Sequence, residues 1–264
     1  MYLDIIKNLL KKFLRIFNLS LTKYDFYESL KKDQKTLEDL KVLCNINDKD
    51  YQKKVDLIKK SNSELKQDFF VLSMLNFKKN GYFVEFGSCD GLKLSNTFLL
   101  EKEFNWNGII AEPAKHWHQE LKKNRKCNIE TDCIWKATGS KLIFKESELA
   151  LYSTIEDLSD KDLHKDLRER GKTYEVITIS LNDLLKKHKA PKDIDYLSID
   201  TEGSEYDILQ NFNFDKYNIK IITCEHNYTE SRSKIFQLLS IKGYQRVFQK
   251  LSKHDDWYIK FNEI

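Results

Sequence analysis

The chain has 264 residues, 41% of them hydrophobic, which is enough for one large domain with its own core, alone or with an appendage. Its formal net charge of +4 argues against a dedicated nucleic-acid binder, because acidic residues are interspersed among the lysines. The five cysteines form no CxxC pair, so the sequence indicates neither a disulfide framework nor a zinc site. No apolar run reaches roughly 18 residues, so no transmembrane helix is indicated, and we expect a cytoplasmic protein.

Residues 1–60 are predicted to form a helical extension. Apolar side chains recur on one helical face of its opening segment, at Leu3, Ile6, Leu10, Phe13 and Phe17. Lysines and an arginine oppose them, and such a basic amphipathic helix can lie on an anionic membrane surface, here through residues 1–20 at the inner face of the membrane. Packing on the chain's own domain, or on a second subunit in a homodimer, is favoured because amphipathic helices usually pack on protein.

Residues 61–264 are predicted to form an α/β domain. Strands are expected at residues 82–86, 107–112, 128–135, 194–200, 220–227, 244–250 and 256–261. Helices are expected between them, at residues 95–104, 114–125, 203–212 and 230–243. This alternation predicts a parallel sheet with helices on both faces, closed by an antiparallel pair of strands. An insertion with extra strands is expected at about residues 141–178.

Acidic and hydrogen-bonding residues gather where the predicted strands end. Ligands of an open parallel sheet bind beyond the carboxyl ends of its strands. The residues expected there are Glu85, Gly87, Asp90, Gly91, Glu112, Asp132, Asp200, Glu202, Gly203, Glu225, His226 and Asn227. The sequence therefore predicts a ligand site at this edge of the sheet.

The loop after the first strand, "GSCDG" at residues 87–91, has the spacing G-x-x-x-G. It lacks the middle glycine that lets a pyrophosphate approach the backbone, which argues against an NAD-dependent oxidoreductase. Its two glycines are expected to clear space for a ligand, and the neighbouring Glu85 and Asp90 suit a ligand with a positively charged part. A tight turn that holds no ligand is an equally available interpretation.

Glu112 ends the second predicted strand, immediately before Pro113. An acid at this place typically accepts hydrogen bonds from ribose hydroxyls, although a solvated loop acid would give the same pattern. A nucleoside with a cationic tail and no phosphate fits both Glu112 and the glycine loop. S-adenosylmethionine is such a ligand.

Several blocks of the chain resemble the FkbM-type methyltransferase family. They are "FVEFGSCDGLKLSNTFLLEKEFNWNGIIAEP", "SLNDLL", "DYLSIDTEGSEYDIL" and "ITCEHN", in this order, with "SELKQDFFVL" before them and "GYQRV…DDWYI" after them. The resemblance spans residues 61–260 and implies a Rossmann-like class I fold, with a mixed, mostly parallel seven-stranded sheet whose last strand is antiparallel. It also implies an enzyme that uses S-adenosyl-L-methionine, releases S-adenosyl-L-homocysteine and methylates hydroxyls of sugars.

The resemblance also implies roles for individual residues. Glu85, Gly87 and Gly91 would hold the methionine part of the cofactor, Glu112 the ribose, and the residues around Asp132 and Cys133 would border the adenine. Further cofactor contacts are expected from Ser88, Asp90, Asn96, Pro113 and Asp200. The chain departs from the family where Cys89 replaces a common asparagine, Asn182 a usual aspartate and Ser198 a frequent lysine. Of these departures, Cys89 is the one expected to shift cofactor contacts.

A base must take the proton of an acceptor hydroxyl. His226 is the leading candidate, because an unperturbed histidine pKa of about 6.5 suits proton acceptance, with a purely structural histidine as the alternative. Further candidates for the acceptor site are Asp200, Glu202 and Asp255, whereas Glu205 is expected to cap the following helix. A divalent metal held by Asp200, Glu225 and Asn227 is an alternative that is not favoured.

The predicted function is O-methylation of a sugar. The acceptor would be a small molecule or a glycan: a nucleotide-activated sugar or a unit of a surface glycan, capsular or lipopolysaccharide, as in bacterial polysaccharide biosynthesis. Two other functions compete with it, an NAD-dependent oxidoreductase and a non-catalytic module of the same fold that docks through its N-terminal helix. The presence of Glu85, Gly87, Gly91 and Glu112 argues against a decayed cofactor site.

Overall fold

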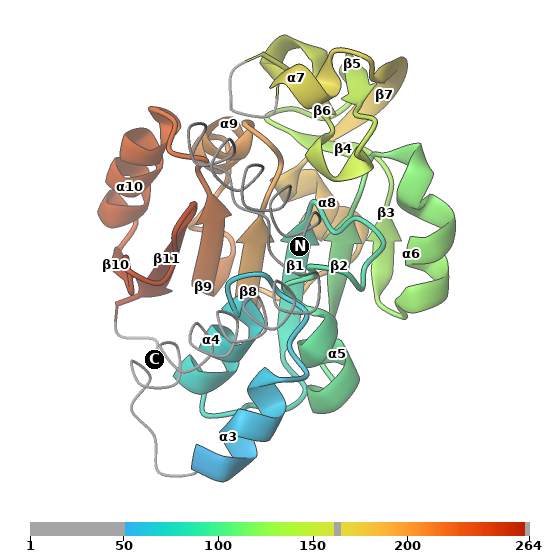
Figure 1. Ribbon diagram of the computed structural model, residues 1–264. Coiled ribbons are helices and arrows are strands. Elements are labelled where there is room, and N and C mark those ends of the chain that lie inside the picture. Colours follow the sequence, from blue (N-terminus) through green and yellow to red (C-terminus); the bar gives the residue numbers. More distant parts are fainter. Residues whose placement is uncertain (1–50, 161–164, 262–264) are drawn as a thin grey trace, which may run out of the picture. The chain divides into compact units, whose positions relative to one another are not determined.

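The computed structural model describes residues 51–160 and 165–261 (Figure 1). The predicted amphipathic stripe, and its contact with a membrane or a second subunit, lie outside these described residues. Among the helices that are described, none combines the length and the hydrophobicity that crossing a membrane requires.

The described residues contain a seven-stranded sheet with the strand order β10-β11-β9-β8-β1-β2-β3. Its strands are β1 (Tyr82–Phe86), β2 (Asn107–Ala111), β3 (Asn128–Glu130), β8 (Asp193–Ile199), β9 (Asn218–Glu225), β10 (Tyr244–Val247) and β11 (Asp255–Lys260). Neighbouring strands are parallel except at β11, which runs antiparallel to both β9 and β10. The predicted fold class, a mixed, mostly parallel sheet with an antiparallel last strand, is confirmed.

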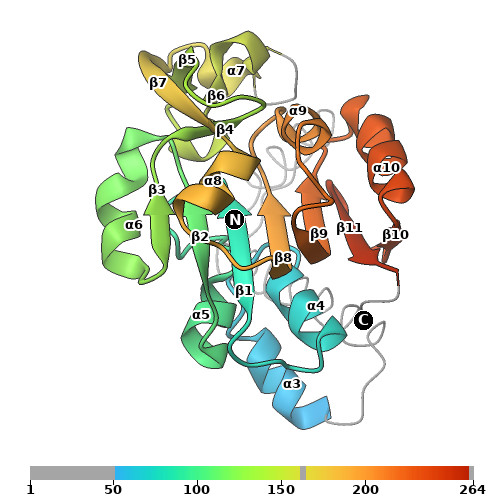
Figure 2. The same cartoon turned by 180° about the vertical axis from the view of Figure 1, so that it is seen from behind.

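Two layers of helices cover this sheet because successive side chains of a strand point to opposite faces. In β1, Phe83 packs into one core, whereas Val84 and Phe86 pack into the other. Figures 1 and 2 show the sheet from its two sides. The core around Phe83 holds residues of α3 (Tyr51–Ile58), α4 (Gln67–Met74), α5 (Phe98–Phe104) and α6 (His118–Asn124), which the short η1 (Lys115–Trp117) precedes. The other core holds residues of α8 (Leu181–Lys187), α9 (Glu205–Gln210) and α10 (Ser231–Ile241).

A second, four-stranded sheet stands at the end of the main sheet where its parallel strands finish (Figure 1). Its strands have the order β4-β7-β5-β6, and are β4 (Cys133–Trp135), β5 (Lys141–Glu146), β6 (Thr154–Ile155) and β7 (Lys172–Ser180). Short helices connect them: η2 (Ala150–Tyr152), η3 (Glu156–Leu158) and α7 (Lys165–Arg168). The expected insertion therefore contains strands of a separate sheet that faces the strand ends.

The prediction of one strand over residues 128–135 is wrong. The chain leaves the main sheet after Glu130 and joins the second sheet at Cys133. The carboxylate of Glu130 accepts hydrogen bonds from the backbone N–H groups of Thr131 and Asp132, at 3.0 and 3.2 Å. A side chain that binds the next two backbone N–H groups favours a turn over a continuous β-strand. Here the turn connects a strand of the main sheet with a strand of the second sheet.

Candidate functional site

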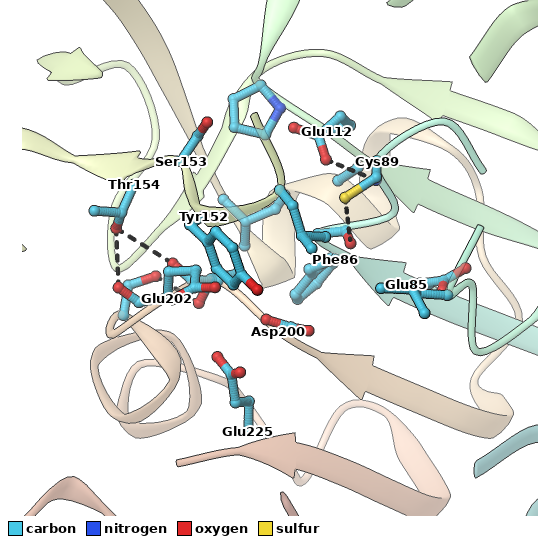
Figure 3. A pocket seen from close by; sticks show the side chains of 18 of the residues that line it. Glu85, Phe86, Cys89, Glu112, Tyr152, Ser153, Thr154, Asp200, Glu202 and Glu225 are labelled. Carbon is cyan, nitrogen blue, oxygen red and sulfur yellow. Dashed lines mark hydrogen bonds between the residues drawn. The ribbon is translucent and has the colours of Figure 1, made fainter. Parts of the chain in front are cut away.

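A cavity of about 400 Å³ lies where β1, β2, β8 and β9 end. Residues just beyond these strands line one side, and residues 150–155 of the second sheet cover it (Figure 3). This is the place where open parallel sheets bind ligands. The predicted site residues that line it are Glu85, Gly87, Asn96, Glu112, Pro113, Cys133, Asp200, Glu202, Glu225 and Asp255.

The remaining predicted site residues do not line this cavity: Ser88, Asp90, Gly91, Asp132, His226 and Asn227. Asp90 instead closes a turn, because its Oδ1 accepts hydrogen bonds from the backbone N–H groups of Leu92 and Lys93. The side chain of Asp132 is 36% exposed and has the Lys187 ammonium 3.7 Å from its Oδ2. The expected contacts of Asp90 with the methionine part and of Asp132 with the adenine are therefore not supported by the cavity.

The two glycines of the loop make room for the protein itself. Both have left-handed backbone angles, with φ of +72° at Gly87 and +73° at Gly91. A Cβ at Gly87 would lie 1.9 Å from the backbone oxygen of Asp200, and one at Gly91 would lie 2.6 Å from side-chain atoms of Leu121 and Arg125. These glycines are therefore required by contacts within the protein, and the expectation that they clear space for a ligand stays a prediction, with the backbone of Gly87 at the border of the cavity.

The carboxylate of Glu85 is occupied by hydrogen bonds and an ion pair within the protein, so a ligand would not meet its full negative charge. Its carboxylate accepts hydrogen bonds from the hydroxyl of Ser95 at 3.1 Å and from the backbone N–H of Asn96 at 2.6 Å. The guanidinium of Arg125, fully buried, approaches it to 3.4 Å and also binds Glu101 at 2.7 Å. Glu85 thus orders the loop after β1, and its negative charge is largely offset by Arg125.

Asn96 lines the cavity and carries a buried acceptor that is not used. Its side chain is 8% exposed, and its Nδ2 donates a hydrogen bond to the hydroxyl of Ser198 at 2.9 Å. Its Oδ1 is buried and has no hydrogen-bond partner. Because a buried carbonyl oxygen without a partner is costly, a ligand donor in the cavity would satisfy it.

Glu112 joins the glycine loop to the loop that follows β2. Its Oε2 accepts a hydrogen bond from the N–H of Cys89 at 2.9 Å, and its Oε1 accepts one from the N–H of Ala114 at 2.8 Å. Burial, opposed by these two hydrogen bonds, raises the pKa of Glu112 to about 7. Each carboxylate oxygen keeps a lone pair, so Glu112 can accept further hydrogen bonds from a ligand in the cavity.

Cys89 takes a left-handed conformation, with φ of 49°, in the loop that Glu112 holds. Asparagine tolerates this conformation better than other residues with a Cβ, because its short polar side chain can bond locally. This gives a physical reason for the asparagine that the resemblance leads one to expect here. The thiol borders the cavity, and its weak contact with the Gly87 carbonyl spans 3.8 Å.

The replacement Cys89→Asn is expected to stabilise the protein by about 0.5–1 kcal/mol, since it relieves left-handed strain. Urea unfolding followed by circular dichroism measures the change. Cys89→Ala serves as the contrast, because it removes the thiol and keeps a strained Cβ, so it should give no gain. Equal stability of the two variants would show that strain at residue 89 is not the cause.

Three carboxyl groups converge at the opposite side of the cavity. One oxygen from each of Asp200, Glu202 and Glu225 lies within 4.8 Å of the others (Figure 3). Burial raises the pKa of Asp200 to about 7, although the hydrogen bond that Asp200 shares with Glu225 acts in the opposite direction. Asn227, which the sequence suggested as the third oxygen ligand, borders a second cavity instead, and Glu202 takes its place.

His226 does not reach the main cavity. Its Nδ1 accepts a hydrogen bond from the N–H of Tyr228 at 3.0 Å, and its Nε2 lies 3.8 Å from Asp256. Burial lowers the pKa of His226 to about 4, so the ring is neutral and weakly basic at physiological pH. The ring borders the second cavity, of about 320 Å³, and the prediction that His226 faces the acceptor as base is not supported by this position.

Asp255 and Asp256 have different surroundings although they are neighbours at the start of β11. Asp255 lines the main cavity, and its Oδ2 accepts a hydrogen bond from Gln67 at 2.8 Å. Burial, with the nearby charge of Asp200, raises the pKa of Asp255 to about 8. Asp256 is 1% exposed and binds Arg232 and Arg246, so it belongs to the framework.

Sequence reasoning missed several polar side chains that line the main cavity, among them Glu64, Gln67, Tyr152 and His254. They come from the segment before β1, from the covering sheet and from the loop before β11. The run "HDDW" at residues 254–257 was a signal for His254, because Asp255 follows it directly. Glu205 begins α9 as predicted, but its carboxylate binds the N–H groups of Thr201 and Gly203, at 3.0 Å, in the loop before the helix.

Comparison with known proteins shows the family to which the chain belongs. Residues 85–256 match the methyltransferase FkbM domain. No curated protein sequence matches the chain. Similar solved structures include a precorrin-6Y C5,15-methyltransferase from Geobacter metallireducens GS-15, with 10% identity over 73% of this chain and 85% of that one and a TM-score of 0.38. A human methyltransferase 10 domain containing protein shares 14% identity over 75% of this chain and 82% of that one, with a TM-score of 0.41.

Proposed function

Because the chain belongs to the FkbM methyltransferase family, we propose that it is an S-adenosylmethionine-dependent O-methyltransferase that acts on a sugar hydroxyl. The observation that carries the proposal is the composition of one cavity. Glu112 and Asn96, whose Oδ1 is buried without a partner, line one part of it, and Asp200 and Asp255 line another. The first part suits a nucleoside with a cationic tail, and the second suits an acceptor rich in hydroxyls.

The residues around the glycine loop fit the cofactor. Ionised Glu112 would accept hydrogen bonds from the ribose hydroxyls, and Asn96 Oδ1 would accept one from the ammonium group. Cys133, Ile134 and Pro113 offer an apolar border for the adenine. When bound, S-adenosylmethionine supplies a methyl group on a positively charged sulfur.

Asp255 is the residue that we propose as the general base. A base works best when its pKa lies near the working pH, and burial gives Asp255 a pKa of about 8. The amide of Gln67 holds its Oδ2, which fixes the carboxylate at the cavity wall. Asp255 would take the proton of the acceptor hydroxyl, while Asp200 would accept a hydrogen bond that orients it.

The charge of the acceptor side bears on the class of sugar. Its acidic residues are Glu64, Asp200, Glu202, Glu225 and Asp255. These would repel a diphosphate placed among them. An uncharged glycan unit therefore fits among these acids directly, whereas a nucleotide-activated sugar requires its diphosphate at the cavity mouth or beside a cation such as Lys93, which also lines the cavity.

Two measurements test the proposed function. Calorimetry with the full-length protein is expected to show binding of S-adenosylhomocysteine, and absence of binding would overturn the proposal. Transfer of a labelled methyl group is then measured on a panel of nucleotide-activated sugars and on surface glycan fragments, with and without Mg²⁺. Cofactor binding without transfer to either class would contradict the sugar acceptor.

The replacement Asp255→Asn is expected to lower kcat by about 100-fold or more, because an amide cannot accept the proton. Affinity for S-adenosylhomocysteine should change by less than about twofold, since a general base is not expected to hold the cofactor. The wild-type rate should rise as pH increases through about 8, where Asp255 loses its proton. Asp193→Asn, an exposed position at the opposite end of β8, is the control and should leave both measurements unchanged. A kcat that Asp255→Asn leaves unaltered would remove this residue from the mechanism.

A further inference from the structure

The carboxyl groups of Asp200, Glu202 and Glu225 come from three different places in the fold. Asp200 follows β8, Glu202 lies in the loop before α9, and Glu225 ends β9. Their side chains point toward a common space in the wall of the main cavity (Figure 3). Each offers one oxygen that lies within 4.8 Å of the other two. Neighbouring strand ends therefore bring three acids together at one point.

Glu225 provides an independent reason to expect a ligand at this point. Glu225 as a whole residue is 8% exposed, and its Oε2 is buried without any hydrogen-bond partner. Figure 3 shows its carboxylate directed toward Asp200 and Glu202. A buried carboxylate oxygen with no donor is costly, so the fold leaves one strong acceptor aimed into the cluster and unsatisfied.

Charges of both signs surround the cluster. Arg168, which is fully buried, binds Glu202 Oε2 at 2.9 Å and offsets one negative charge. The adjacent Glu205 uses an oxygen to bind backbone N–H groups and adds further negative charge. A positive ligand between the three carboxyl groups would stabilise them all, because like charges at this distance in a buried site repel strongly.

We propose that Asp200, Glu202 and Glu225 bind one divalent cation. Carboxylate oxygens are the preferred ligands of Mg²⁺, Ca²⁺ and Mn²⁺. Two oxygens on opposite sides of Ca²⁺ lie up to about 5 Å apart, and on Mg²⁺ up to about 4.2 Å. Because the three oxygens lie within 4.8 Å of one another, small movements of the side chains would bring all three onto a single cation.

The site opens into the part of the cavity assigned to the acceptor. Three protein ligands leave coordination positions for water or for an acceptor hydroxyl. A cation there would orient the hydroxyl and make its proton easier to remove by Asp255. This role rests on the proposed function, whereas cation binding itself does not, and the two can fail separately.

Electron paramagnetic resonance with Mn²⁺ tests the inference without any acceptor. Full-length protein freed of metal with EDTA is titrated with MnCl₂, and loss of the free Mn²⁺ signal reports binding. Wild-type protein is expected to bind about one Mn²⁺, and Glu225→Gln and Asp200→Asn should each weaken binding roughly tenfold or more, because each removes a charged ligand. Mg²⁺ and Ca²⁺ should displace the bound Mn²⁺.

Glu175→Gln is the matched control, an exposed glutamate on β7 away from the cluster, and it should bind Mn²⁺ as the wild type does. Wild-type binding no stronger than that of Glu225→Gln would overturn the inference. Thermal unfolding and calorimetry with S-adenosylhomocysteine accompany each variant, and Asp200→Asn decides the matter if Glu225→Gln does not fold. Binding of S-adenosylhomocysteine without binding of Mn²⁺ would contradict the cation site alone. Binding of Mn²⁺ without binding of S-adenosylhomocysteine would contradict the proposed function alone.

Discussion

The replacement Glu112→Gln is expected to weaken binding of S-adenosylhomocysteine by roughly 10–100-fold, the equivalent of one or two charge-assisted hydrogen bonds. Glutamine keeps the shape of the side chain and loses the charge that the ribose hydroxyls would meet. Its amide also carries only one acceptor oxygen for the two N–H groups of Cys89 and Ala114 that Glu112 now holds. Calorimetry on the purified variant measures the loss.

The same carboxylate predicts a pH dependence of cofactor binding. Burial raises the pKa of Glu112 to about 7, so the side chain is ionised above that pH and protonated below it. Since the ionised form is the stronger acceptor, wild-type affinity for S-adenosylhomocysteine should fall as pH decreases from 8 to 6, by at most about tenfold per pH unit. The Glu112→Gln protein should show a flat profile over this range.

Glu120→Gln, an exposed position on α6, is the control and should keep both the affinity and its pH dependence. Circular dichroism shows whether Glu112→Gln remains folded. If it does not, the wild-type pH profile still tests the prediction. Affinity that does not change between pH 8 and pH 6 would contradict a role for ionised Glu112.

The replacement Gly87→Ala is expected to destabilise the protein by about 4 kcal/mol or more, which is beyond the range of ordinary substitutions. The new methyl group would lie 1.9 Å from the backbone oxygen of Asp200, far inside van der Waals contact. Neither backbone can move easily, because each follows directly on one of the paired central strands β1 and β8. The left-handed φ of +72° adds about 1–2 kcal/mol of strain for any residue with a Cβ.

Gly139→Ala separates the clash from the strain. Gly139 has a similar φ of +83°, but a Cβ there would meet no atom within 4 Å. Its loss of stability should therefore be limited to about 1–2 kcal/mol. Thermal unfolding of the two variants measures the difference. Equal melting temperatures would mean that the clash with the backbone oxygen of Asp200 does not add to the loss of stability.

Most of the main sheet could be predicted from the sequence because its signals are local. Apolar runs such as "YFVEF" have strand length, and the helical stretches between them keep a period near 3.6. The strand at 128–135 was predicted wrongly because apolar residues stand on both sides of the polar residues 130–132, so the whole stretch was taken as one strand. Only the contact of Glu130 with the following backbone N–H groups divides it.

The location of the candidate site could be predicted from the sequence, but the residues that line it could be predicted only in part. Glu112 and Asp200 line the cavity because their positions follow from strand ends alone. His226 and Asn227 also follow a strand, yet they line only the second cavity, whereas Glu202 lines both cavities and His254 lines the main one. Orientation after a strand end depends on which neighbouring loop supplies a hydrogen-bond partner, and no local pattern encodes that choice.

By itself, the sequence determined the alternation of strands and helices, the glycine loop at Gly87 and Gly91 and the acids at the strand ends, because these depend on residues close in the chain. Only the tertiary structure decided what those residues meet. Gly87 makes room for the backbone of Asp200, and Arg125 offsets the charge of Glu85. These partners lie far apart in sequence, so their contacts exist only once β1, β2 and β8 have paired.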